Sequence, residues 1–291
     1  MSGNCTFDIK SVKDTAWCPG CGDFGILAAV KSALEALEKK PSEVLMVGGI
    51  GQAAKLPQYI SANGLCSLHG RALPGAIAAK IANRDLTVLV NSGDGDCLGE
   101  GGNHFLHAVR RNPDITLMMH NNQIYGLTKG QGSPTSDPGL ITSLQPRGVI
   151  MTPVKAPALA LTLGCGFIAR GFSGDPAGLS EIIQAGVHHK GLSFIEILQP
   201  CVSMNKVNTF AWYKSRFKPV TEIEPGYDPS DREAALRMCE TWGDIIPGGI
   251  LYRNDTLVPF EDRLSMPNRG TLVNQPPRSR EKLEAVFRDF M

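Results

Sequence analysis

Two short polar motifs stand where consecutive apolar runs end. Gly93-Asp94-Gly95-Asp96 follows Leu86–Val90, and Asn121-Asn122 ends the next run, which places Asn122 twenty-eight positions after Asp94. In a parallel crossover unit the carboxyl ends of two strands lie side by side, so one carboxylate and one amide oxygen meet there. Such hard oxygen ligands suit Mg²⁺, which binds a few protein oxygens together with ligand phosphates. The spacing therefore predicts one βαβ unit that holds a metal diphosphate, with glycines on both sides of Asp94 letting the backbone approach it.

Helix-like and strand-like segments alternate along most of the chain. Apolar residues recur at helical spacing from Gly22 to Lys39, with Asp23 as the expected cap, and over Ala177–Lys190 after the helix start Asp175-Pro176. Between them lie short β-branched or leucine-rich runs, namely Val44–Val47, Leu86–Val90, Ile115–Met119, Phe167–Ala169 and Phe194–Leu198. This alternation predicts an α/β fold with a doubly wound, mostly parallel sheet covered on both faces.

The regular pattern is interrupted in two regions. Residues 130–157 are rich in proline and glycine and are expected to form a long loop over the site. After about residue 205 only Asp231–Cys239 and Arg280–Phe290 keep helical character, which is too little for an independent core. We therefore expect a diphosphate-binding domain over residues 1–205 and an irregular C-terminal arm over 206–291 that packs on this domain and on a partner subunit.

Composition limits the partners and the compartment. The 29 basic and 28 acidic residues nearly balance and no basic run occurs, which disfavours nucleic acid and anionic membranes as partners. Met1–Lys13 lacks the apolar core of a secretory signal, and no uninterrupted apolar span reaches about 18 residues. A cytoplasmic protein is expected, in which the eight cysteines serve as thiols or metal ligands rather than as a disulfide framework.

Several further motifs occur in a fixed order along the chain. They are Trp17-Cys18-Pro19-Gly20-Cys21-Gly22, Gly49-Ile50-Gly51, Leu68-His69-Gly70-Arg71, Gly102-Asn103-His104, Tyr125-Gly126-Leu127-Thr128-Lys129-Gly130-Gln131 and Gln199-Pro200-Cys201. Together with the GDG and NN motifs, this order resembles the β subunits of the thiamine diphosphate (TPP)-dependent 2-oxoacid:ferredoxin oxidoreductases, with most likeness to the 2-oxoglutarate type. The resemblance covers nearly the full length of the chain.

The resemblance implies a role for each motif around TPP. Mg²⁺ would be bound by Asp94, Asn122 and the backbone carbonyl of Ile124. The residues expected against the diphosphate are Gly95, Asp96, Gly126 and Leu127. Those expected against the thiamine are Ile50, Gly51, Gln52 and Ala53, with His69 near its reactive end.

The segment Gly49–Ala54 also matches the loose G-x-G-x-x-A pattern of dinucleotide-binding folds. A nicotinamide site would carry an acidic residue about twenty positions further on to hold the ribose. No Asp or Glu occurs between Glu43 and Asp85. NAD is therefore a minor alternative, which would require Arg71 to receive a 2′-phosphate.

The pair Cys18 and Cys21 is compatible with a zinc half-site, a thiol-disulfide pair or half of an iron-sulfur site. The resemblance favours a [4Fe-4S] cluster with Cys201 as third ligand, but Gln52 stands where many relatives carry the fourth cysteine. Three outcomes follow: another cysteine substitutes, with Cys66 as first choice, a non-cysteine group or water closes the fourth iron, or no cluster forms. The other thiols, Cys5, Cys97, Cys165 and Cys239, are expected to be ordinary buried or surface residues.

The resemblance further implies oxidative decarboxylation of a 2-oxoacid to acyl-coenzyme A and CO₂, with electrons passing to ferredoxin. The reverse reaction is a reductive carboxylation of the kind used in a reductive TCA cycle. The pyrimidine-binding domain and its carboxylate would come from an α subunit, in an (αβ)₂ assembly. Lys55 and Lys129 are the candidates for pairing with the distal carboxylate of 2-oxoglutarate, which is favoured over pyruvate, and coenzyme A is an alternative partner for Lys129. The alternatives are a non-redox TPP-dependent decarboxylase subunit and a non-catalytic scaffold, which the cysteines and the intact metal ligands disfavour.

Overall fold

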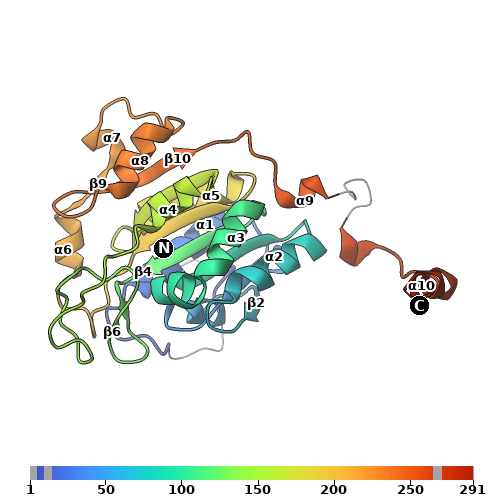
Figure 1. Cartoon of the computed structure of the whole chain (residues 1–291), viewed down its shortest axis with the longest axis horizontal. Helices are drawn as coiled ribbons and strands as arrows, with labels where there is room; N and C mark the ends of the chain where they lie inside the picture. The colour runs from blue at the N-terminus through green and yellow to red at the C-terminus, as the bar shows by residue number, and fades with distance from the viewer. Residues whose placement is uncertain (1–4, 10–14, 265–270, 291) are drawn as a thin grey trace.

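The computed structural model describes residues 5–9, 15–264 and 271–290, so most of Met1–Lys13 lies outside the described residues. Eight strands form one sheet in the order β2-β1-β3-β4-β8-β7-β10-β9, with β7 and β10 paired antiparallel and the other neighbours parallel (Figure 1). Their bounds are β1 Val44–Gly48, β2 Asn63–Cys66, β3 Thr87–Gly93, β4 Thr116–Asn121, β7 Phe167–Phe172, β8 Ser193–Leu198, β9 Phe217–Pro219 and β10 Ile246–Arg253. The predicted α/β class with a mostly parallel sheet is confirmed.

Helices cover both faces of this sheet. The longer ones are α1 Asp23–Ala36, α2 Ala72–Ala82, α3 Gly102–Arg111, α4 Ala156–Thr162, α5 Pro176–His188, α8 Arg232–Glu240 and α10 Arg280–Arg288. Short turns of helix are η1 Pro41–Glu43, η2 Ala53–Gln58, η3 Gly95–Glu100, α6 Phe210–Lys214, α7 Val220–Ile223, α9 Phe260–Arg263 and η5 Leu272–Asn274, and a small ribbon pairs β5 Ile124–Tyr125 with β6 Gln131–Gly132. Among the described residues no helix is both long and apolar enough to cross a membrane.

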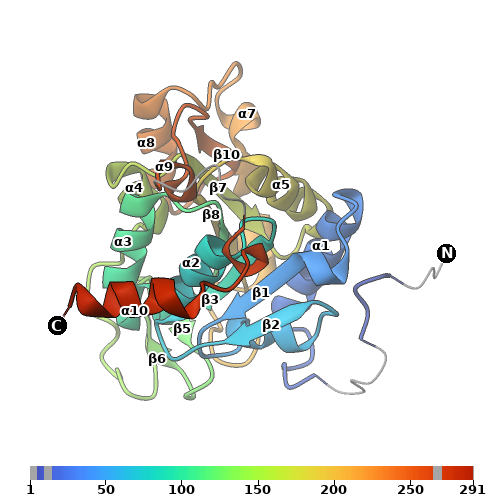
Figure 2. The same cartoon turned by 90° about the vertical axis from the view of Figure 1, so that its right-hand side faces the viewer.

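Side chains alternate between the two faces along each central strand, as the period of two requires. Leu45 and Val47 of β1 belong to the cluster that includes residues of α2, α3, α4 and α8. Val44 and Met46 belong to the cluster that includes residues of α1 and α5. Figure 2 shows α1 and α5 on one side of the sheet and α3 and α4 on the other, so the core has two layers.

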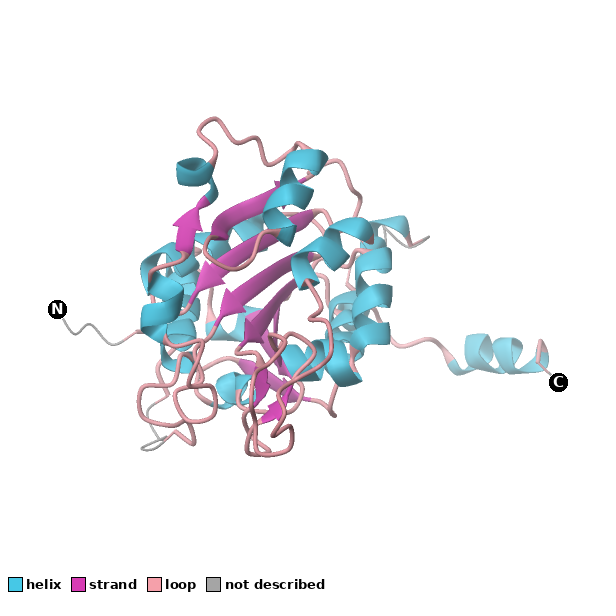
Figure 3. Cartoon of the chain, turned by 60° about the vertical axis from the view of Figure 1, so that its left-hand side comes forward, coloured by secondary structure: helices cyan, strands magenta, loops and turns pink. Residues whose placement is uncertain are grey.

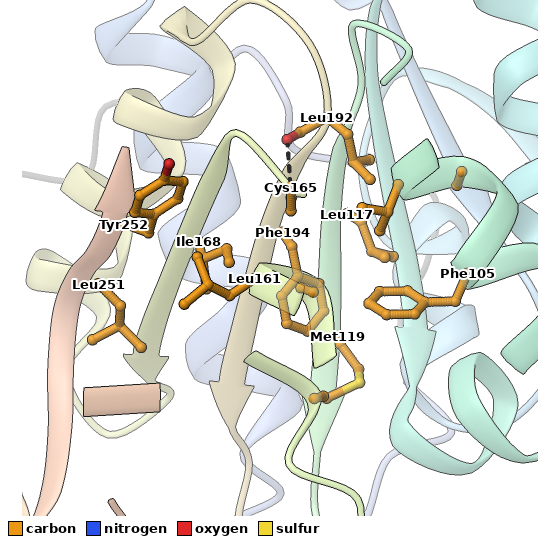
Figure 4. Packing of buried hydrophobic residues seen from close by; sticks show 14 of the residues in the cluster. Phe105, Leu117, Met119, Leu161, Cys165, Ile168, Leu192, Phe194, Leu251 and Tyr252 are labelled. Atoms are coloured by element: carbon orange, nitrogen blue, oxygen red, sulfur yellow. Dashed lines mark hydrogen bonds between the residues drawn. The ribbon is translucent and has the colours of Figure 1, made fainter. Parts of the chain in front are cut away.

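The first of these layers is close-packed around two aromatic rings. Phe105 of α3 meets Phe194 of β8 edge-on, with ring centroids 5.3 Å apart (Figure 4). Both rings are fully buried. Cys165 lies in the same layer, where its thiol donates to the carbonyl of Leu192. Cys165 is therefore a small core residue, as the sequence indicated.

The segment after residue 205 contributes to the sheet as well as to the surface. Strands β9 and β10 extend the sheet beyond β7, and α8 packs into the core layer with Ala235 and Met238. Both helices predicted in this segment are present, as α8 and α10. Helix α10 has no buried residue, and Figures 1 and 3 show it projecting away from the rest of the chain. The boundary at residue 205 stays a prediction.

A buried ion pair ties this C-terminal segment to the sheet. Arg170 of β7 donates through Nε to Glu196 of β8 at 2.7 Å, and both side chains are at most 4% exposed. The same guanidinium donates to the carbonyls of Pro247 and Cys239 and lies over the Trp242 ring. Among the described residues, the partners that the Arg170 side chain finds beyond β8 therefore come from residues 239–247.

Asp23 was expected to cap the first helix, and this prediction was wrong. Gly22 occupies the capping position, and Asp23 is the first helical residue. The Asp23 carboxylate is 1% exposed and lies 2.8 Å from Nδ1 of buried His120. It therefore serves a tertiary contact beneath the sheet edge, because a buried carboxylate requires a hydrogen-bond partner.

Candidate active site

The carboxyl edge of β3 and β4 carries the two polar motifs. Gly93 pairs with His120 in the parallel ladder, so Asp94 and Asn121-Asn122 leave the sheet side by side. This is the neighbourhood that the spacing predicts. The chain after Asp94 enters η3, a short π-helix, a form that is often found at functional sites.

A cavity opens at this edge. Of the residues expected at the site, those lining it are Cys18, Cys21, Ile50, Gly51, Gln52, Ala53, His69, Asp94, Gly95, Asp96, Asn122, Ile124, Gly126, Leu127, Lys129 and Cys201. Lys55 and Cys66 are not among the lining residues. Lys55 lies half-buried in η2, and Cys66 is exposed at the end of β2, where Gln58 Nε2 is 3.9 Å from its sulfur.

Asp94 is a buried carboxylate at this edge of the sheet. It is 1% exposed, and Oδ2 accepts hydrogen bonds from the hydroxyls of Ser133, at 2.5 Å, and Thr135. Burial raises the pKa of Asp94 to about 6, against the lowering effect of the two hydroxyls. In the described part of the chain no Lys, Arg or His forms an ion pair with it. Such a group is stabilised by a bound cation.

Asn122 completes the oxygen-rich edge. Its Oδ1 accepts from the amide of Ile124 at 3.0 Å, which leaves one lone pair of that oxygen for another ligand. Its backbone carbonyl accepts from Asn205 Nδ2 at 3.2 Å. Asp94 and Asn122 thus present a carboxylate and an amide oxygen to one cavity.

Asp96 fixes the loops around the cavity rather than standing free. Its Oδ1 accepts from the amides of Ile50, at 3.1 Å, and Gly70, at 2.7 Å, and lies 2.7 Å from His69 Nδ1. Its Oδ2 accepts from Ser92. Because Oδ1 is shared by three donors, Asp96 holds two loops that approach from different strands. A side chain at Gly49 would collide with it, since an added Cβ would lie 2.0 Å from Oδ2.

Gly95 is required by a ring as well as by the turn. A Cβ at this position would lie 2.3 Å from the Tyr125 ring. The Tyr125 hydroxyl is within hydrogen-bond distance of Glu100 and of the Gly95 carbonyl. Tyr125 lines the same cavity, so the close packing of Gly95 against Tyr125 helps to shape the cavity.

The sequence missed the residues that hold the 130–157 loop against Asp94. Gln123 adopts a left-handed backbone, with φ 58°, and donates through Nε2 to the carbonyl of Thr135 at 2.9 Å. Its Oε1 accepts from Tyr213 at 3.0 Å. Ser133 and Thr135 stand within a loop whose composition predicted no contacts. The signal for this turn in the sequence was the Asn-Asn pair followed directly by a non-glycine residue. Asparagine side chains often close such turns, and here Asn121 Oδ1 accepts a hydrogen bond from the Gln123 amide.

Three thiols are among the residues that line the cavity. Cys18 is exposed, Cys21 and Cys201 are half-buried, and Gln199 Nε2 lies 3.3 Å from the Cys21 sulfur. Burial, followed by the charge of Asp23 and to a lesser degree that of Cys201, raises the pKa of Cys21. Among the described residues no three His, Cys, Asp or Glu side chains are grouped closely enough to hold a single metal ion.

We expect Asp96→Ala to lower the stability of the purified β subunit by about 2 kcal/mol or more, because the Ile50 and Gly70 amides lose their acceptor. Urea denaturation measures the effect. The matched control is Asp244→Ala, an exposed carboxylate whose removal should change stability by less than about 0.5 kcal/mol. Equal stabilities of the two variants would contradict the role given to Asp96.

Comparison with known proteins leads to the family that the sequence motifs resemble. The family model described as thiamine pyrophosphate enzyme, C-terminal TPP binding domain, matches residues 20–197. A second model, for the C-terminal part of the pyruvate ferredoxin oxidoreductase beta subunit, matches residues 201–268. The first match contains both motifs at the sheet edge and supports TPP as a cofactor of this chain.

Individual relatives agree with the family models. The 2-oxoacid:ferredoxin oxidoreductase subunit beta of Saccharolobus solfataricus is 43% identical over 89% of this chain and 88% of its own length. The 2-oxoglutarate oxidoreductase subunit KorB of Mycobacterium tuberculosis is 41% identical over 68% of this chain and 53% of its own length. A solved 2-oxoglutarate:ferredoxin oxidoreductase from Magnetococcus marinus superposes with a TM-score of 0.87 at 32% identity, covering 96% of this chain and 94% of that one. This chain belongs to the β subunits of the 2-oxoacid:ferredoxin oxidoreductases.

Proposed function

We propose that this enzyme subunit works with an α subunit to convert 2-oxoglutarate, coenzyme A and oxidised ferredoxin to succinyl-coenzyme A, CO₂ and reduced ferredoxin, and the reverse. The observation that carries the proposal is the buried carboxylate of Asp94, which lies beside Asn122 at the edge of a TPP-binding sheet. The solved relative is described with 2-oxoglutarate, coenzyme A and succinyl-CoA bound, and several relatives are named 2-oxoglutarate synthase subunits, which favours 2-oxoglutarate over pyruvate. The eight free cysteines support a cytoplasmic location.

The residues present fit a Mg²⁺-diphosphate. Mg²⁺ would be held by the Asp94 carboxylate, the Asn122 amide oxygen and the Ile124 carbonyl, all of which are hard oxygen donors. The cation would supply the positive charge that the described residues do not give to Asp94. Gly95, Gly126 and Leu127 line the same cavity and would face the diphosphate, while Asp96 supports this wall through its own contacts.

We expect Asp94→Asn to weaken Mg²⁺-dependent TPP binding to the αβ complex at least about tenfold, because the metal loses its anionic ligand. Isothermal titration calorimetry with and without Mg²⁺ measures this. Asp244→Asn, an exposed acid away from the cavity, is the control and should bind normally. Unchanged affinity in the Asp94 variant would remove the metal assignment.

The bound TPP supplies the electron sink for decarboxylation, and this chain positions the reacting groups. Ile50, Gly51, Gln52 and Ala53 line the cavity from the β1 side and would hold the thiamine. His69 lines the cavity, is kept in place by Asp96 and lies 3.5 Å from Glu100. We propose it as the proton donor and acceptor for the substrate.

Lys129 is the cavity-lining cation for a dicarboxylate. It is exposed and adopts φ 81°, which turns the loop at the cavity rim. Lys55 was predicted for the same role but does not line the cavity. We therefore propose Lys129 as the residue that binds the distal carboxylate. A distal carboxylate of 2-oxoglutarate would pair with this ammonium, and pyruvate has no such group.

The αβ complex should reduce a viologen dye with 2-oxoglutarate and coenzyme A. Lys129→Met is expected to raise KM for 2-oxoglutarate at least about tenfold with little effect on pyruvate, since a charge-assisted hydrogen bond is lost. Lys55→Met is the matched control with little effect on either substrate. Equal losses for both 2-oxoacids in Lys129→Met would place the lysine elsewhere in the reaction, and the absence of any 2-oxoacid-dependent reduction would contradict the function.

The three cavity thiols favour the redox enzyme over a non-redox decarboxylase, which has no need of them. They would supply three of the four ligands of a [4Fe-4S] cluster, which when bound would carry single electrons towards ferredoxin. A four-iron cluster spreads its sulfur ligands further apart than one metal ion does, so the lack of a tight single-ion group in the described residues does not oppose it.

The name of the family implies an α subunit, and the described surface offers places for it. The carboxylates lining the cavity are Asp23, Asp94 and Asp96, and each is engaged within this chain. The carboxylate that activates the pyrimidine is therefore proposed to come from α. Helix α10 presents an apolar face with Leu283, Val286 and Phe287, each at least 41% exposed, and we propose that this C-terminal arm packs on a partner subunit of an (αβ)₂ assembly.

We expect the double variant Leu283→Asp/Phe287→Asp to weaken assembly with the α subunit, because it charges the apolar face of α10. Analytical ultracentrifugation measures assembly. The isolated β subunit should keep its urea midpoint, since α10 has no buried residue. Glu281→Gln on the same helix is the control. Normal assembly of the double variant would exclude α10 from the interface.

A further inference from the structure

Only three of the chain's cysteines are available to the cavity. All eight lie in the described part of the chain, and those lining the cavity are Cys18, Cys21 and Cys201. Cys97, Cys165 and Cys239 are buried in the core layer formed with α2, α3, α4 and α8. Cys5 packs against the other layer. A [4Fe-4S] cluster held by cysteine alone needs four thiolates, so this chain falls one short.

Cys66 is held away from the cavity by the sheet. It is the last residue of β2, where it pairs with Gly48 of β1 in the parallel register. Its side chain is exposed and does not line the cavity. Bringing its sulfur to the thiols would require breaking the end of the β1–β2 ladder. Cys66 was the first choice from the sequence as the fourth cluster ligand. It is disfavoured because it would have to break pairing in the sheet, which a group already lining the cavity would not.

Gln52 offers an amide oxygen as a ligand for the fourth iron of such a cluster. It lines the same cavity as the three thiols, and its backbone carbonyl is fixed by the Trp17 indole at 2.9 Å. Its Oε1 is buried and has no hydrogen-bond partner in the described structure. Buried polar atoms without a partner are uncommon, and this oxygen, a lone-pair donor, belongs to a residue that lines the same cavity as the three thiols.

On the basis of the proposed function, we propose that the cluster of this subunit is held by Cys18, Cys21 and Cys201 and that its fourth iron has an oxygen ligand at Gln52. The ligand is the amide oxygen itself or a water that the amide holds. This site is chemically distinct from a four-thiolate cluster, because a neutral oxygen replaces an anionic sulfur. The fourth iron is then the most weakly held.

The expected chemistry is the loss of that iron on mild oxidation. A [4Fe-4S]²⁺ cluster that releases one Fe²⁺ and gives one electron to ferricyanide becomes [3Fe-4S]⁺, and ferricyanide becomes ferrocyanide. The three thiolate ligands stay bound throughout. Added Fe²⁺ together with a one-electron reductant restores the original cluster.

The test uses the αβ complex purified without oxygen. Ferricyanide is added in steps, released iron is measured with a chelator, and the [3Fe-4S] signal is followed by EPR. The complex is expected to release one iron per cluster and to give the [3Fe-4S] signal. Gln52→Cys supplies a fourth thiolate and should slow the release at least tenfold, while Cys66→Ser, the control, should behave as the unaltered complex.

Two results would overturn the proposal while leaving the diphosphate site intact. One is an unaltered cluster that keeps its iron as firmly as the Gln52→Cys cluster, and the other is a Cys66→Ser complex that already lacks the fourth iron before ferricyanide is added, when the unaltered complex contains it. A complex that binds Mg²⁺-TPP in calorimetry but contains no iron or sulfide also overturns it, whereas loss of TPP binding as well shows that the proposed function has failed. In ¹⁷O-enriched water, broadening of the EPR signal of the reduced [4Fe-4S] cluster assigns the ligand to water, and its absence assigns it to the amide.

Discussion

The parallel pairing of β3 with β4 is the constraint on which the site depends. With Gly93 opposite His120, the next residues of both strands leave the sheet at one point, and Asp94 meets the Asn121-Asn122 pair there. A shift of one residue would send these side chains to opposite faces of the sheet. The two buried layers on either face hold the register, because Leu89 and Met118 face one layer while Val90 and Leu117 face the other.

Many hydrogen bonds around the cavity stabilise the buried carboxylate of Asp94, which forms no ion pair among the described residues. Ser133 and Thr135 satisfy the oxygen of Asp94, and Thr135 also donates to Asn121 or to Asp94, since its single proton serves one acceptor at a time. Asn121 donates to Glu196, which is paired with Arg170. The C-terminal segment closes this network through its carbonyls, so the arm and the diphosphate edge are connected by hydrogen bonds across four strands.

The features that could be predicted from the sequence are those that depend on local residue patterns. Strand periodicity and the GDG and NN motifs placed Asp94 and Asn122 because both effects act within a few residues. The sequence could not place Ser133 or Thr135, whose positions depend on the left-handed backbone at Gln123 and a contact with Tyr213 ninety residues away. It likewise gave no sign that β10 would pair antiparallel with β7, because that pairing depends on long-range packing. Asp23 looked like a cap, and its contact with His120 is visible only in three dimensions.

The most direct test of the account is the position of the metal. Crystals of the αβ complex with TPP and Mn²⁺ in place of Mg²⁺ would show the ion in an anomalous difference map. One peak per β subunit is expected, bonded to the Asp94 carboxylate, the Asn122 amide oxygen and the Ile124 carbonyl. A peak bonded to other residues, or TPP bound with Asp94 still closed off by Ser133 and Thr135, would contradict it.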